Sequence, residues 1–122
     1  MPLSRDFKET VRERAQTDPE FRFAMLQGAL SALDVGEAFE AKILLRDFIN
    51  ATIGFQALGE AIDRDPKALM RMFSPKGNPT LENLALVLKE LAEREAYSVK
   101  VERRASRPAT PVKRPPRVKA AA

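Results

Sequence analysis

Hydrophobic residues recur along most of the chain at the three- and four-residue spacing of amphipathic helices. The spacing predicts helices over about residues 5–16, 19–35, 37–51, 55–62, 66–73 and 81–95. Asp18 and Asp65 each precede a Pro, and an Asp that caps a helix followed by Pro at its first position is a typical start. Ser4 and Thr80 are further predicted caps, and Gly36 is predicted to end the second helix.

Each predicted helix has an apolar face that assigns one side of it to the core. In the longer helices these positions are Phe7, Val11 and Ala15, then Phe21, Met25, Leu26, Ala29, Leu30 and Leu33, then Phe39, Ile43, Leu44, Phe48 and Ile49, and finally Leu84, Val87, Leu88 and Leu91.

The pattern changes after the last helix. Residues 97–102 alternate apolar and polar side chains, which predicts one short strand. A lone strand needs a partner, and the same strand of a second copy would supply it. Residues 104–122 hold four Pro and no acidic residue, a composition that predicts a disordered tail. The tail is either a solubilising extension or a basic arm that attracts phosphate.

The residue types that the chain lacks exclude several classes of function. Without Cys or His there are no disulfides, no thiolate nucleophile and no zinc site of the usual kind. Asp63 and Asp65 could act as acid and base, but no nucleophile accompanies them, so we expect no enzyme, cofactor or metal. No apolar run is long enough for a membrane helix and no signal peptide is evident, so we expect a cytoplasmic protein.

The net charge of +4 is unevenly distributed. All 17 acidic residues lie at or before Glu102, whereas seven of the 21 basic residues follow it. Residues 1–102 therefore carry 14 basic against 17 acidic side chains, a net charge of −3. Within this acidic part, residues 63–76 carry a local excess of basic side chains, which favours an anionic partner there.

Residues 55–62 and 66–73 are two short helices only three residues apart, which is the spacing of a helix-turn-helix motif. Placed at 100° per residue, Phe55, Leu58, Ala61 and Ile62 face inward in the first, and Gln56 and Glu60 face away. Gly59 stands where a small residue would let the two helices approach closely. In the second helix Leu69, Met72 and Phe73 belong to the core, and Lys67 and Arg71 lie opposite with Met70 beside them.

Long cationic side chains on the outer face of such a helix can reach phosphates or guanine edges in the major groove. We expect DNA contacts from Gln56, Lys67, Met70, Arg71, Ser74 and Lys76, with Lys67 and Arg71 nearest the bases and Gln56, Ser74 and Lys76 on phosphates. The same pair, Lys67 and Arg71, could instead form only a solvated face.

The stretch from Gly54 to Leu81 resembles the small helix-turn-helix proteins described as probable addiction-module antidotes, relatives of the repressor-type (Xre-type) transcriptional regulators. Leu69, Arg71, Ser74 and the run GNPTL at 77–81 carry the resemblance, which extends over about residues 36–102. It implies binding of operator DNA as a dimer, repression and, in many members, neutralisation of a small toxin protein.

The chain departs from that family in its turn, where Asp63, Arg64 and Asp65 replace a glycine, an apolar residue and a capping serine. Asp63 can still adopt the left-handed conformation. We do not expect Arg64 to serve as a buried anchor, and Asp65 brings a negative charge near phosphate.

The sequence therefore predicts an all-α fold with a helical extension over 1–35, a repressor-like helix-turn-helix domain over 36–102 that ends in one short strand, and a disordered basic tail over 103–122. We predict a homodimer that binds double-stranded DNA in a sequence-specific way and regulates transcription. One form of this function is that of the antitoxin in a toxin–antitoxin pair. The alternative is a protein-interaction module, either a toxin-binding antidote or a helix-turn-helix descendant that does not read DNA. The acidic domain and the two Asp of the turn favour that alternative.

Overall fold

A computed structural model describes residues 5–104, and every regular element in this part of the chain is a helix. The predicted all-α fold is confirmed. The helices are α1 (Arg5–Thr17), α2 (Pro19–Asp34), α3 (Ala38–Ala51), α4 (Phe55–Ile62), α5 (Pro66–Met72) and α6 (Leu81–Glu95). Their ends lie within about one residue of the predicted ones because the local signals that start and stop them are strong. The predicted cap at Ser4 lies outside the described residues.

Three of the predicted capping residues hold the first turns of their helices. Asp18 accepts hydrogen bonds from two first-turn amides at 3.1 and 3.2 Å. Asp65 accepts one at 3.1 Å, and the Thr80 hydroxyl oxygen accepts one at 3.1 Å. Caps of this kind each stabilise a helix by about 1 kcal/mol, so they fix where α2, α5 and α6 begin.

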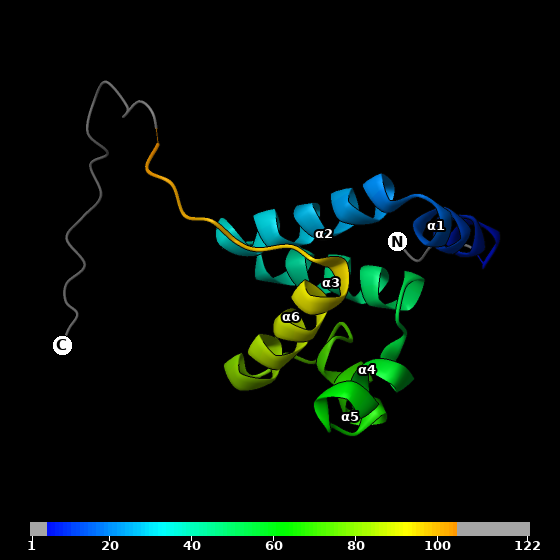
Figure 1. Ribbon diagram of the computed structural model, residues 1–122. Helices are drawn as coiled ribbons and strands as arrows, with labels where there is room; N and C mark the ends of the chain where they lie inside the picture. Colours follow the sequence, from blue (N-terminus) through cyan, green and yellow to red (C-terminus); the bar gives the residue numbers. More distant parts are fainter. Residues whose placement is uncertain (1–4, 105–122) are drawn as a thin grey trace.

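Helices α2 and α3 lie side by side as an antiparallel pair, and α1 packs across one end of that pair (Figure 1). The short helices α4 and α5 form a compact corner that follows the C-terminal end of α3, the end against which α1 packs, and α6 packs against α4. Helix α5 therefore lies on the opposite side of the molecule from α2.

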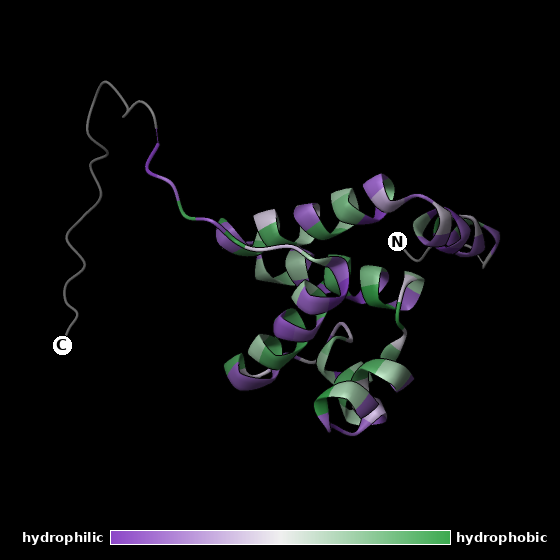
Figure 2. Ribbon diagram, viewed as in Figure 1, coloured by the Kyte–Doolittle hydropathy of each residue, from purple (hydrophilic) through white to green (hydrophobic). Residues whose placement is uncertain are grey.

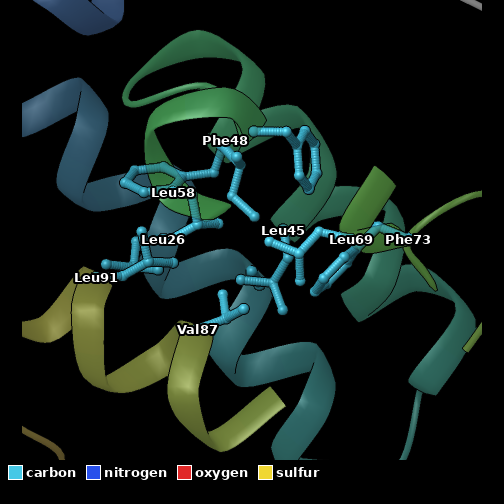
Figure 3. Close-up of a cluster of buried hydrophobic side chains, with 11 residues drawn as sticks. Leu26, Leu45, Phe48, Leu58, Leu69, Phe73, Val87 and Leu91 are labelled. Carbon is cyan, nitrogen blue, oxygen red and sulfur yellow. The ribbon is translucent and has the colours of Figure 1, made fainter. Parts of the chain in front are cut away.

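One apolar core joins these helices, and Figure 3 shows its side chains converging from α2, α3, α4, α5 and α6. Figure 2 shows that the helices carry both hydrophilic and hydrophobic positions, as expected for helices with one buried stripe. Leu26 and Ala29 of α2 lie in the same core. The boundary predicted between a helical extension over 1–35 and a domain over 36–102 stays a prediction. The core consists of Leu26, Ala29, Leu45, Phe48, Ile49, Phe55, Leu58, Leu69, Phe73, Val87 and Leu91.

Three residues on the predicted apolar helix faces are largely exposed to solvent. Phe7 is 52% exposed, Phe39 is 62% exposed, and Ala61 lies on the surface of α4. The prediction for Phe39 is wrong because the buried stripe of α3 is rotated toward Lys42, Leu45 and Ile49. Lys42 is the one charged residue of that stripe, whose other buried members are Ala41, Leu45, Phe48, Ile49 and Ala51.

The strand predicted over 97–102 is not supported, since the described residues contain no strand. The segment is extended and runs back along α2 (Figure 1). Tyr97 packs against the core, and its hydroxyl donates a hydrogen bond to the Leu88 carbonyl oxygen at 3.4 Å. Val99 and Val101 are exposed. A strand requires a neighbour for its ladder, and the other described residues are helical or in turns.

None of the described helices is long and apolar enough to cross a membrane. The disordered tail predicted over 103–122 lies, from residue 105 onward, outside the described residues.

Candidate nucleic-acid interface

Helix α5 is anchored by its inner face and presents a cationic outer face. Leu69 and Phe73 are fully buried, and the Phe73 ring lies 5.9 Å from the Phe55 ring, centroid to centroid, at an interplanar angle of 47°. Lys67, Met70 and Arg71 are all exposed, Met70 by 53%. The structure thus brings these three predicted residues together on one accessible face.

The turn between α4 and α5 depends on two residues with special geometry. Asp63 ends α4 with φ 58° and ψ 50°, which confirms the left-handed conformation predicted for it. Gly59 is buried, and a Cβ at this position would lie 2.7 Å from the Arg64 carbonyl oxygen and 2.9 Å from Pro66 Cγ. The predicted close approach at Gly59 is therefore confirmed, and it fixes how α5 leaves α4.

Arg64 anchors the turn by polar contacts rather than apolar ones. Its Nε donates a hydrogen bond to Asn83 Oδ1 at 2.8 Å, and its Nη2 lies 3.5 Å from Glu82 Oε2. These contacts join the turn to the first helical turn of α6. Sequence reasoning missed this role because the partners lie 18 and 19 residues away along the chain. Arg64 is thus engaged within the protein.

The remaining predicted contact residues surround α5. Gln56 is exposed on α4, where its Nε2 donates a hydrogen bond to Glu60 Oε2 at 2.8 Å. The Ser74 hydroxyl donates to the Arg71 carbonyl oxygen at 2.7 Å, so its proton is used and its lone pairs remain. Lys76 is exposed in the loop after α5.

The loop at residues 74–79 is held from behind by a lysine that sequence reasoning missed. Lys42 of α3 is only 6% exposed, and its Nζ donates hydrogen bonds to the carbonyl oxygens of Pro75 at 3.2 Å and Gly77 at 2.6 Å. Its Nζ also lies 5.1 Å from the centroid of the Phe39 ring. The available signal was that Lys42 shares the helical stripe of Leu45 and Ile49.

Gly77 places the same loop directly against the end of α5. A Cβ at this position would overlap the Arg71 carbonyl oxygen, so only glycine allows this approach. The Arg71 carbonyl also accepts a hydrogen bond from the Ser74 amide at 3.1 Å. The backbone of Arg71 and the loop therefore form one packed unit.

A hollow of about 570 Å³ lies between α1 and α3, away from α5. Lys8, Arg12, Arg46 and Asp47 contribute to its lining. Burial raises the pKa of the Asp47 carboxyl, and the nearby charges of Arg46 and Lys8 oppose that rise. No group of three or more His, Cys, Asp or Glu residues in the described part of the chain could hold a metal ion. The hollow shares no residue with the α5 surface.

Comparisons with protein families, with curated proteins and with solved structures find no match for this chain.

Proposed function

We propose that this protein is a sequence-specific DNA-binding regulator of the helix-turn-helix type and that α5 is its recognition helix. The observation that carries the proposal is the division of α5 into a buried face, Leu69 and Phe73, and an exposed cationic face, Lys67 and Arg71. The three-residue turn at 63–65 and the contact at Gly59 complete the motif. In this proposal the arrangement is repressor-like, as the resemblance of residues 54–81 to that family implies.

The dimensions of α5 suit the major groove. An α-helix with its side chains is about 10 to 12 Å in diameter, and the major groove is about 12 Å wide, so α5 can enter it. In this proposal Arg71 and Lys67 reach base edges or phosphates, and Met70 beside them packs against bases. Gln56, Ser74 and Lys76 contact the flanking phosphates, which orient the helix without reading sequence.

A homodimer is part of the same proposal. Two-fold symmetry would place two copies of α5 on a palindromic site, about 34 Å apart. The backbone of residues 97–102 is extended, and Val99 is 73% exposed, so pairing of this segment with its copy would form the ladder that one chain lacks.

The experiment is fluorescence anisotropy of the purified full chain with a labelled duplex from upstream of its own gene. A duplex with the same base composition in shuffled order serves as the control, and both are measured at the same salt concentration. The proposal expects at least tenfold tighter binding to the upstream duplex. Equal affinity for the two duplexes would contradict sequence reading.

A second candidate function is that of a protein-interaction module, with a small toxin protein as one possible partner. Phe23, Val35 and Val99 are exposed around one groove between α2 and residues 97–100, on the side opposite α5. Exposed apolar surface of this kind favours contact with protein. In this case binding of the partner would depend on Phe23, and Lys67 and Arg71 would have no effect on it.

A further inference from the structure

We propose that Lys42 is a positioning residue that turns the loop at 74–79 into a binding site for the DNA phosphate backbone, with the amides of Lys76 and Asn78 as donors. This inference rests on the proposed function, since it names how the same surface would hold the phosphodiester chain. Lys42 lies behind the loop and touches no DNA in this arrangement.

Two peptide units of the loop point their carbonyl oxygens toward Lys42. The Lys42 ammonium draws the carbonyls of Pro75 and Gly77 inward by hydrogen bonds of 3.2 and 2.6 Å. A trans peptide holds its carbonyl and its amide N–H on opposite sides of the chain, and the described residues contain no cis peptide. The N–H groups of the two following residues, Lys76 and Asn78, therefore point away from Lys42.

The amides of Lys76 and Asn78 are available to an external acceptor. Within residues 5–104 neither the Lys76 amide nor the Asn78 amide donates a hydrogen bond, whereas the intervening Gly77 amide donates to the Ser74 carbonyl oxygen at 3.0 Å. Both residues are exposed. Two outward amides with one residue between them, beside the Lys76 side chain, are donors of the kind that contact phosphate oxygens.

Contacts within the protein hold the loop at 74–79 in this shape without DNA. Gly77 lies against the Arg71 carbonyl, which fixes one side of the loop to α5, and Lys42 fixes the other side to α3. The lysine is nine-tenths buried, so its hydrogen bonds are shielded from water. The phosphate site and the base-contacting face of α5 are thus held in one rigid frame, and DNA binding need not order the loop.

The test compares the full chain with Lys42→Met, which has a side chain of similar length and no hydrogen-bond donors. Lys100→Met is the control because it removes an equal charge from the segment beside α2. Lys42→Gln, which keeps one donor without the charge, is the second variant if Lys42→Met fails to fold. Loop order is measured without DNA by the heteronuclear NOE of the amides of Lys76 and Asn78. Affinity is measured on the upstream and shuffled duplexes.

We expect the loop amides to lose order in Lys42→Met and to stay ordered in Lys100→Met. Affinity should fall by about tenfold on both duplexes, because DNA must then order the loop before its two amides can donate, and phosphates carry no sequence information. The ratio of the two affinities should stay unchanged. In the parent, the amide proton resonances of Lys76 and Asn78 should shift downfield when the duplex is added.

Three results would overturn the inference: an ordered loop in the Lys42 variants, unchanged affinity despite a disordered loop, or parent amides that do not shift on DNA. A parent that binds neither duplex overturns the proposed function and the phosphate role together. The loop measurement needs no DNA, so it decides separately whether Lys42 holds the loop.

Discussion

Replacing Phe73 by Ala should separate the residues that hold α5 from those that would contact DNA. The Phe73 side chain is fully buried and lies against the Phe55 ring, with 5.9 Å between centroids. Removing a buried phenyl ring costs about 3 to 5 kcal/mol, because apolar contacts are lost and a cavity remains. Collapse into that cavity is restricted, since Gly77 and Lys42 hold the adjoining loop. We therefore expect the upper part of this range.

The assay is urea unfolding followed by helical circular dichroism. At a slope of about 1.5 to 2 kcal/mol per molar urea, a loss of about 4 kcal/mol lowers the midpoint by about 2 to 3 M. The matched control is Met70→Ala in the same helix, where the side chain is 53% exposed. A surface change of that kind should alter the free energy of unfolding by less than about 0.5 kcal/mol.

DNA binding by the Phe73 variant should fall only as far as its unfolded fraction requires. A midpoint within about 0.5 M of the parent would refute the reasoning, because a fully buried aromatic anchor cannot be removed at so small a cost. A large loss of stability in Met70→Ala would contradict the assignment of the outer face.

Four further predictions follow from other parts of the molecule. Arg71→Ala should leave the unfolding midpoint unchanged and weaken binding to the upstream duplex by about 1 to 3 kcal/mol, with relaxed preference at one base pair; a uniform loss on all duplexes would make Arg71 a phosphate contact instead. Asp47→Asn should raise the thermal midpoint at pH 7, because burial raises the pKa of this carboxyl and its charged form therefore lowers the stability of the fold above the unfolded pKa. This gain in midpoint should vanish as the pH falls below 3.8. A lower midpoint for the variant at pH 7 would show that the ion pair with Arg46 outweighs the burial. Val99→Pro should weaken a dimer built on residues 97–102, measured by sedimentation, whereas a parent that is monomeric at micromolar concentration would exclude that dimer. Cutting the chain after Glu102 should preserve helical content and flatten the salt dependence of DNA binding, and unfolding of the shortened chain would contradict the tail prediction.

The helices could be predicted from the sequence because their signals are local. Asp18, Asp65 and Thr80 each cap the helix that they were predicted to cap, and their hydrogen bonds reach residues two or three positions away. The inner faces of α5 and α6 followed from spacing alone, since Leu69, Phe73, Val87 and Leu91 are all buried.

The errors and omissions have a common physical origin in contacts that are distant along the chain. Lys42 shares the buried stripe of Leu45 and Ile49, but its partners are loop carbonyls 33 and 35 residues away, which no local pattern identifies. Arg64 finds its partners on α6 in the same way. The alternation at 97–102 predicts an extended backbone, but a strand also needs a neighbour, which no other described segment of the chain supplies.

The most direct test of the central claim is the affinity of the Lys67→Ala/Arg71→Ala double variant for the upstream duplex, measured by fluorescence anisotropy. The control is Lys89→Ala/Lys100→Ala, which removes the same charge from exposed positions outside α5. Circular dichroism first establishes that each variant is folded. The account predicts that the α5 variant loses at least a hundredfold in affinity and its preference over the shuffled duplex, while the control stays within about threefold of the parent. A folded α5 variant that binds the upstream duplex as tightly as the parent would contradict the account.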